Sequence, residues 1–172
     1  YDVRASYAVK DVVAKYQGKA LINRVGHAFI KRRMREEDAI FGGEVTGHYY
    51  FRGNFYADNG FIPALLILEL MSRKGQSLGD LLRPLRERYF ISGEINTKVA
   101  SMDVAAGKIE RLAREYAHGN VYRLDGISAE FDDWHFNVRP SNTEPLLRLN
   151  LEGLTPEIME RRRDEVLGII RG

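Results

Sequence analysis

Two runs of alternating apolar and polar residues near the C-terminus constrain the fold of this chain most. Their apolar positions are Trp134, Phe136, Val138, Leu147, Leu149 and Leu151. A period of two places successive side chains on opposite faces of a strand, so both runs are predicted to be strands with one buried and one solvated face. The loop that joins them is bracketed by Pro140 and Pro145.

The rest of the C-terminal half predicts more strands and two helices. Residues 95–99 are a candidate strand, and residues 121–124 and 127–131 are predicted to pair as a hairpin across Asp125-Gly126, a dipeptide typical of two-residue turns. Apolar spacing over residues 105–116 predicts a helix, and Thr155-Pro156 predicts the start of a last one. Together these elements predict a small α+β domain over residues 89–172.

Residues 1–88 instead alternate between helical and extended patterns, which predicts an α/β domain. Helices are expected over residues 9–16, from Gly26 to Met34 and over residues 61–71, and strands over residues 20–25 and 39–41. The helix at 61–71 is apolar on nearly all sides, so we expect it to be buried. Ser77 and Asp80 have the spacing of a capping box before a stripe of leucines.

Composition excludes several classes of protein. The chain has 172 residues of which 29% are charged, and no apolar run approaches the roughly 20 residues that a membrane-spanning helix needs. The absence of cysteine rules out disulfides, thiol nucleophiles and thiolate metal sites and fits a cytoplasmic location. The start at Tyr1 shows no signal peptide, and the missing methionine predicts a processed or truncated chain.

Two basic runs, at residues 31–33 and 161–163, raise the question of nucleic-acid binding. Each run is followed by acidic residues within a helical pattern, and the net charge is only +2. We therefore expect solvated helix faces with ion pairs four residues apart rather than a nucleic-acid interface.

A first polar cluster follows the strand predicted at residues 39–41, in the sequence Gly43-Glu44-Val45-Thr46-Gly47-His48. An ionised Glu44 can accept two hydroxyl hydrogen bonds, Thr46 can donate or accept, and glycines allow close backbone approach. These groups suit the hydroxyls of a sugar. A solvated glycine turn is the alternative interpretation.

A second cluster lies in the loop between the two alternating runs, where Arg139 precedes Pro140-Ser141-Asn142-Thr143 and Arg148 follows in the next strand. A guanidinium can bind phosphate oxygens in bidentate fashion, while hydroxyls, an amide and backbone N–H groups complete the shell. The pattern predicts a phosphate-binding loop. A simple polar turn is the alternative.

The two clusters together resemble the α-D-phosphohexomutase superfamily, in which a sugar-binding loop GE-x-[ST]-GH precedes a phosphate-binding loop R-x-SNT-x-P. The SNT triplet at residues 141–143 is more similar to the phosphomannomutase/phosphoglucomutase group than to phosphoglucosamine mutases. The resemblance covers the whole chain. It implies that residues 1–88 form a mixed-sheet α/β domain three whose first strand is missing, and residues 89–172 an α+β, TATA-box-binding-protein-like domain four.

Residue by residue, the resemblance implies that Glu44 and Thr46 bind O3 and O4 of the sugar, with His48 near the ligand and further contacts from His27 and Arg4. Lysine often stands at position 4 in related enzymes, and arginine keeps its charge while changing its geometry. The non-reacting phosphate would be held by Arg139, Ser141, Asn142, Thr143 and Arg148.

The family's chemistry also needs a phosphoserine in a Ser-His context and a magnesium loop of the Asp-x-Asp-x-Asp-Arg type. No serine of this chain is followed by histidine, and Asp132-Asp133 lacks the spacing of such a loop. The resemblance therefore implies that this chain holds no catalytic and no metal-binding residue. Mg²⁺ and the phosphoserine would belong to N-terminal domains of the same polypeptide.

The activity implied by the resemblance is that of an isomerase which interconverts hexose 1-phosphates and hexose 6-phosphates. Its phosphoserine would act through a glucose or mannose 1,6-bisphosphate intermediate, and this chain would supply only sugar and phosphate recognition. A stand-alone, non-catalytic module that binds sugar phosphates is the alternative.

Overall fold

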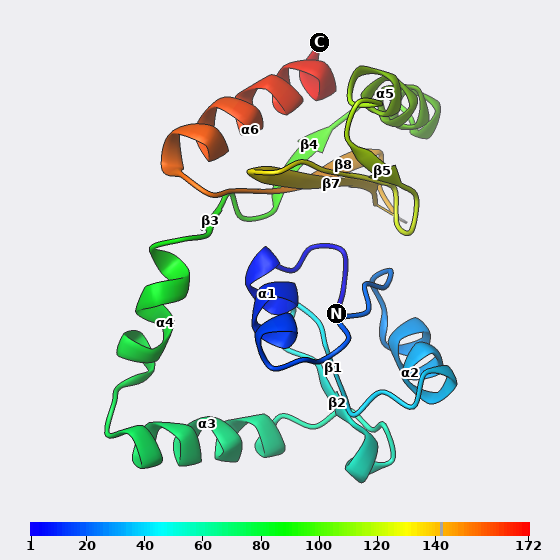
Figure 1. The fold of residues 1–172 in the computed structure, drawn as a ribbon. Helices are drawn as coiled ribbons and strands as arrows, with labels where there is room; N and C mark the ends of the chain where they lie inside the picture. The colour runs from blue at the N-terminus through cyan, green and yellow to red at the C-terminus, as the bar shows by residue number, and fades with distance from the viewer. Residues whose placement is uncertain (142) are drawn as a thin grey trace. The chain divides into compact units, whose positions relative to one another are not determined.

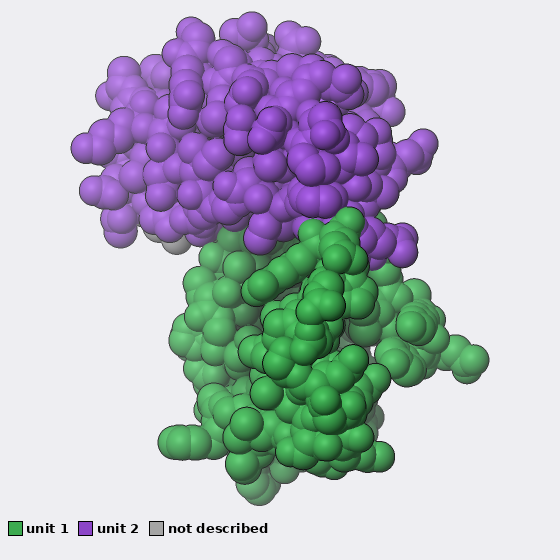
Figure 2. All heavy atoms as spheres, turned by 90° about the vertical axis from the view of Figure 1, so that its left-hand side faces the viewer, with its two compact units in different colours: residues 1–87 green, residues 88–172 purple. Residues whose placement is uncertain are grey.

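The computed structural model describes residues 1–141 and 143–172 and divides into two compact units, residues 1–87 and 88–172 (Figure 1, Figure 2). Unit 1 combines helices with a β hairpin, whereas unit 2 is an antiparallel sheet with helices. The fold class is therefore α/β followed by α+β, as the sequence predicts.

Unit 1 is built from helices around a hairpin. Its helices are α1 (Tyr7–Lys15), α2 (His27–Glu36), α3 (Phe61–Lys74) and α4 (Leu78–Arg86), and its strands are β1 (Phe41–Gly43) and β2 (Tyr49–Phe51), followed by the short 3₁₀ helix η1 (Arg52–Asn54). β1 and β2 pair antiparallel, with Gly43 opposite Tyr49. The predicted capping box is confirmed, because the Ser77 hydroxyl accepts from the Asp80 N–H and the Asp80 carboxylate accepts from Ser77.

A small core packs the hairpin against α2. Ile30 and Met34 of α2 and Tyr50 of β2 are buried, and Ala39 and Tyr56 pack on them. This contact fixes the start of α2 relative to the loop between β1 and β2, which is where the first predicted cluster lies.

Two predictions for unit 1 are wrong. Residues 20–25 do not form a strand. They pair with the short segment at residues 1–3, and this pairing is limited to one parallel bridge between Asp2 and Asn23. Helix α3 is not buried: Phe61 is 83% and Leu65 66% exposed. A helix that is apolar on all sides needs neighbours on every side to be buried, and α3 contacts α4 in unit 1 but keeps much of its surface exposed.

Unit 2 is a sheet in the order β3-β8-β7-β6-β5, with β4 also paired to β8. Its strands are β3 (Phe90–Ile91), β4 (Ile95–Lys98), β5 (Asn120–Tyr122), β6 (Ile127–Glu130), β7 (Trp134–Pro140) and β8 (Leu146–Gly153), and its helices are α5 (Met102–Glu115) and α6 (Pro156–Arg171). Both helices lie on the same face of the sheet (Figure 1). Thr155 caps α6 through its side chain, as Thr155-Pro156 predicts.

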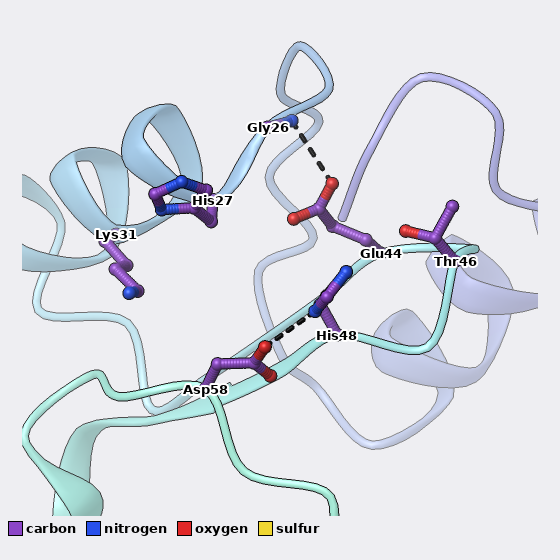
Figure 3. A pocket seen from close by; sticks show the side chains of 7 residues that line it. All are labelled: Gly26, His27, Lys31, Glu44, Thr46, His48 and Asp58. Carbon is purple, nitrogen blue, oxygen red and sulfur yellow. Dashed lines mark hydrogen bonds and ion pairs between the residues drawn. The ribbon is translucent and has the colours of Figure 1, made fainter.

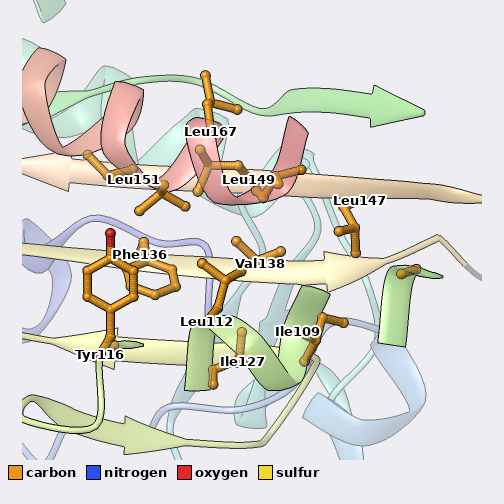
Figure 4. Close-up of a cluster of buried hydrophobic side chains, with 14 of the residues drawn as sticks. Ile109, Leu112, Tyr116, Ile127, Phe136, Val138, Leu147, Leu149, Leu151 and Leu167 are labelled. Atoms are coloured by element: carbon orange, nitrogen blue, oxygen red, sulfur yellow. The ribbon is translucent and has the colours of Figure 1, made fainter. Parts of the chain in front are cut away.

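The core of unit 2 lies between that face and the two helices (Figure 4). The apolar positions of both alternating runs point into it, which confirms the predicted period. Its largest members from the strands and helices include Leu112, Phe136, Val138, Leu149 and Val166.

The opposite face of β7 and β8 is not solvated as predicted. His135, Asn137 and Glu152 are 8%, 1% and 2% exposed. The polar side chains there pair with one another: His135 lies opposite Glu152 in the register, with 3.3 Å between Nε2 and Oε1. A period of two identifies the polar face but does not show what lies against it.

The predicted hairpin at Asp125-Gly126 is confirmed as β5 and β6, but its loop is longer than two residues. The last paired residues are Tyr122 and Ser128. The Asn137 amide explains the extra length, because it donates to the Asp125 carbonyl at 2.8 Å and holds the loop against β7. Gly126 passes so close to β7 that a Cβ there would lie 2.6 Å from the Arg139 Cα.

Candidate functional site

A pocket of about 480 Å³ opens in unit 1 between the start of α2 and the β1–β2 loop (Figure 3). It is lined by Gly26, His27, Lys31, Glu44, Thr46, His48 and Asp58. The structure thus brings together four of the residues predicted to contact a sugar. Lys31 and Asp58 are additions that the sequence did not indicate.

Glu44 is the most constrained side chain of this pocket. It is 7% exposed, its Oε1 accepts from the Tyr50 hydroxyl at 2.6 Å, and its Oε2 accepts from the Gly26 N–H at 3.2 Å. Burial raises the pKa of the Tyr50 phenol, and the hydrogen bond to Glu44 raises it further, so Tyr50 stays a donor at neutral pH. The carboxylate is therefore held in one orientation before any ligand binds.

The loop that carries Glu44 and Thr46 is a tight turn. The Glu44 N–H donates to the His48 carbonyl at 2.9 Å, and the Gly47 N–H donates to the Glu44 carbonyl at 3.0 Å. Gly47 has φ of +87°, a conformation that favours glycine. Gly47 thus serves the turn, and the turn presents Thr46 to the pocket.

Arg4 is not one of the residues that line the pocket. Its guanidinium forms two hydrogen bonds to Asp2, at 3.0 and 2.8 Å, and its Nη2 lies 3.9 Å from Glu44 Oε2. Asp2 in turn accepts from the Val45 N–H at 2.9 Å. In this structure Arg4 therefore braces the loop from the side of Asp2, and a direct contact of Arg4 with a sugar stays a prediction.

His48 forms a pair with Asp58 beside the pocket. The distance between His48 Nδ1 and Asp58 Oδ2 is 2.6 Å, and the other Asp58 oxygen accepts from the Tyr49 N–H at 3.1 Å. Because an ionised carboxylate only accepts, the proton lies on Nδ1 and Nε2 is left for a ligand. The hydrogen bond from His48 lowers the pKa of Asp58 below its usual value.

His48→Ala is expected to raise the pKa of Asp58 back toward that of an ordinary aspartate, since the largest cause of its lowering is the His48 hydrogen bond. In the wild type the folded-state pKa is depressed, so the pair stabilises the fold above the ordinary aspartate pKa of about 4 and loses that effect as pH falls through the lower, folded value. A pH titration of the Asp58 carboxyl carbon by NMR measures both pKa values. Identical titration curves for the two proteins would contradict the pairing.

His27 and Lys31 enter the pocket from α2, where they lie four residues apart on one helix face (Figure 3). The sequence placed Lys31 in a solvated basic run and did not indicate that it lines the pocket. Its spacing from His27 was the available signal. Arg33 does pair with Glu37 at 3.0 Å, and Arg161 lies 4.0 Å from Glu165, which confirms the solvated interpretation for the other parts of the two runs.

The second cluster lies in unit 2, in the loop between β7 and β8. The Ser141 N–H donates to the Leu146 carbonyl at 2.9 Å, and the Ser141 hydroxyl accepts from the Thr143 N–H at 3.4 Å. Asn142 lies outside the described residues. The loop thus keeps Ser141 and Thr143 side by side at its start.

Two arginines flank this loop on neighbouring strands. Arg139 of β7 lies directly opposite Arg148 of β8 in the register. Glu94, which immediately precedes β4, bridges them: Arg139 Nη2 donates to Oε2 at 3.1 Å and Arg148 Nη1 donates to Oε1 at 3.3 Å. The sequence predicted both arginines, but it did not indicate Glu94, since nothing in the spacing shows that β4 pairs with β8.

Within residues 1–141 and 143–172, no three histidine, aspartate or glutamate side chains are grouped so that they could hold a metal ion. The helices in that part of the chain are also too short or too polar to cross a membrane.

Comparisons with known proteins identify the family. Residues 1–89 match the phosphoglucomutase/phosphomannomutase alpha/beta/alpha domain III, and residues 94–169 match the phosphoglucomutase/phosphomannomutase C-terminal domain. The chain therefore belongs to the phosphoglucomutase/phosphomannomutase family, of which it carries domain III and the C-terminal domain.

Curated relatives and a solved structure agree with this assignment. A phosphomannomutase of Salmonella montevideo is 46% identical over 172 residues, and the phosphohexose mutases of Xanthomonas campestris are 43% identical over 175 residues. A crystal structure of a phosphoglucomutase/phosphomannomutase family protein from Burkholderia thailandensis matches 99% of this chain and 36% of its own, with a TM-score of 0.81 and 24% identity, which supports the fold. The chain spans 37% of the length of the Salmonella relative.

Proposed function

We propose that this chain is the sugar- and phosphate-recognition part of a phosphohexomutase that interconverts hexose 1-phosphates and hexose 6-phosphates. Residues 1–88 would act as the sugar-binding domain and residues 89–172 as the phosphate-binding domain. The phosphoserine that transfers the phosphoryl group and the Mg²⁺ that assists it would lie in other domains of the polypeptide. The curated relatives support this division, since they are longer than this chain.

The observation that carries the proposal is the arginine pair beside the β7–β8 loop. Like charges directly opposite each other on neighbouring strands destabilise a sheet unless an anion lies between them. Arg139 and Arg148 occupy such positions, and Glu94 accepts from both of them but leaves their buried Nε atoms without a hydrogen-bond partner among the described residues. Guanidinium groups bind phosphate oxygens through directed N–H groups, and the Ser141 and Thr143 hydroxyls supply further partners.

The pocket of unit 1 supports the sugar half of the proposal. Its Glu44 carboxylate is fixed by Tyr50 and Gly26, and Thr46 lies beside it in the turn. We propose that these two residues bind O3 and O4 of the hexose, with His48 Nε2 and His27 near the ligand. Contacts to O3 and O4 alone do not distinguish the configuration at C2, where mannose and glucose differ, so phosphates of both sugars would be accepted.

Recognition of this kind also permits the two phosphoryl-transfer steps of a mutase, which form the 1,6-bisphosphate and then break it down. A phosphate site that does not distinguish phosphate on C1 from phosphate on C6 can hold the 1,6-bisphosphate in either orientation. The sugar groups at O3 and O4 lie between the two ends, so the same residues serve both orientations. The chain's own residues bind and orient the sugar, and the phosphoryl transfer takes place outside them.

Arg139→Ala tests the phosphate assignment in a full-length protein that carries this chain. We expect kcat/KM to fall roughly 10- to 100-fold, because a hydrogen bond to a charged group contributes about 1.5–3 kcal/mol. Steady-state kinetics with mannose 1-phosphate measures this loss. Arg123→Ala is the control, since Arg123 pairs with Glu110 on the surface and should be replaceable without loss. Unchanged kinetics in both variants would remove Arg139 from the site.

A further inference from the structure

Glu94 has no part in the proposed recognition, yet it binds both arginines of the phosphate site. It lies two residues before Asn96, and Asn96 is opposite Arg148, which is opposite Arg139. Residues two apart in an extended segment share a face, so all four side chains lie on one face of the sheet. The two Glu94 oxygens each accept from a different arginine, so the carboxylate sits between the two guanidinium groups.

The contacts of Glu94 leave the arginines incompletely satisfied. The bonds of 3.1 and 3.3 Å are longer than the 2.7–2.9 Å typical of charge-assisted hydrogen bonds. The Nε atoms of Arg139 and Arg148 are buried and have no hydrogen-bond partner among the described residues. Buried donors are normally paired, so one carboxylate is a poor match for two guanidinium groups.

The Glu94 side chain is also free to leave. It is 29% exposed, and its partners Arg148 and Arg139 are 31% and 12% exposed. The pair with Arg148 is partly solvated and therefore weak, and the Glu94 carboxylate regains hydration when it swings out. The displacement of Glu94 by a stronger anion is therefore inexpensive.

We propose that Glu94 is an internal competitor for the phosphate group. Without ligand, it occupies the space between Arg139 and Arg148, and a bound phosphate displaces it. This inference rests on the proposed function, because it assigns the arginine pair to phosphate. The inference is that Glu94 sets the affinity of the arginine pair for phosphate.

A competitor of this kind suits a site that must release its phosphate in every reaction cycle. Two guanidinium groups without a counter-ion carry a charge of +2 and hold a phosphate dianion tightly, whereas Glu94 reduces the charge of the cluster to +1. It also returns to the arginines as the phosphate leaves, so the bare cation pair is never left unpaired. A bisphosphate can reorient only if the site releases one phosphate and then binds the other, so phosphate binding must be reversible.

The experiment measures the binding of inorganic phosphate and of mannose 1-phosphate to the 172-residue chain by isothermal titration calorimetry at low ionic strength. The variants are Glu94→Gln, which removes the charge, and Glu94→Ala, which also removes the acceptor. Glu110→Gln is the matched control, because it changes the net charge equally and breaks an arginine pair of the same unit. Circular dichroism checks that each variant is folded.

We expect Kd for both ligands to fall roughly three- to tenfold in the two Glu94 variants and to stay unchanged in the control, since the carboxylate that competes for both arginines is removed. The gain should shrink in high salt, which screens the competing charge. Unchanged binding in the Glu94 variants would overturn the inference, and weaker binding would overturn it by showing that Glu94 supports the arginines. If both ligands bind equally well after Arg139→Ala, the proposed phosphate site fails instead, and the competitor with it.

Discussion

Gly126→Ala is expected to lower the free energy of unfolding of unit 2 by about 2–5 kcal/mol. Gly126 has φ of +68°, where an L side chain costs roughly 1–2 kcal/mol. Its Cβ would also contact the Val138 carbonyl and lie 2.6 Å from the Arg139 Cα. Both neighbours are backbone atoms of a central strand, so relief requires movement of β7, and overpacking of this kind costs about 1–3 kcal/mol.

The measurement is urea denaturation followed by tryptophan fluorescence. The sequence contains one tryptophan, Trp134, and it lies in the core of unit 2, so its emission reports the unfolding of that unit. Gly107→Ala is the control. Gly107 lies within α5 with nothing near its Cβ, so alanine should stabilise the helix by up to about 1 kcal/mol. Equal midpoints for Gly126→Ala and the wild type would show that the loop moves aside without strain.

The same close approach links the fold to the proposed phosphate site. The β5–β6 loop packs on β7 at Arg139, and Asn137 ties that loop down through the Asp125 carbonyl. A displaced strand end would shift Arg139 relative to Arg148. The position of the arginine pair therefore depends on a glycine that is far from it in the sequence.

Local sequence patterns predicted much of unit 2, because the residues that form its core are the alternating apolar residues of its strands. The apolar positions of β7 and β8 face the core, and the cap of α6 is at Thr155. What the sequence could not indicate were contacts that depend on how strands are ordered, such as Glu94 beside Arg148. The burial of the polar sheet face has the same origin, because pairing partners such as His135 and Glu152 are set by the register.

Unit 1 shows a different limit. The helix at α3 was predicted correctly as a helix and wrongly as buried, since composition shows which surfaces require cover but not which neighbours provide it. For the pocket, the motif at residues 43–48 indicated Glu44, Thr46 and His48. The residues that orient them were not visible, because Tyr50 lies outside the motif in β2 and Asp58 comes from a separate loop.

Glu44→Gln is expected to destabilise unit 1 by about 3–5 kcal/mol, as is usual when one partner of a buried charged network is removed. The Glu44 side chain is 4% exposed and lies 3.9 Å from Arg4, so solvent screens it little. Glutamine keeps the shape but offers one oxygen and one N–H₂ group to two donors, the Tyr50 hydroxyl and the Gly26 N–H. One donor is then left facing another donor.

Trp134 lies in unit 2 and does not report this loss, so amide hydrogen exchange at Gly26 and Val45 is the measurement. We expect faster exchange at both, because the loop and the start of α2 lose the acceptor that joins them. Tyr50→Phe is the matched control: it removes one hydrogen bond and keeps the charge, so it should cost about 1–3 kcal/mol and leave the Gly26 contact in place. In the full-length protein, Glu44→Gln should also lower kcat/KM more than Tyr50→Phe does, since a sugar-binding carboxylate is lost in addition to the brace. Exchange rates that are unchanged at Gly26 would show that α2 and the loop are joined by the Ile30 and Met34 contacts alone, and Glu44 would then be available to bind ligand without a structural role.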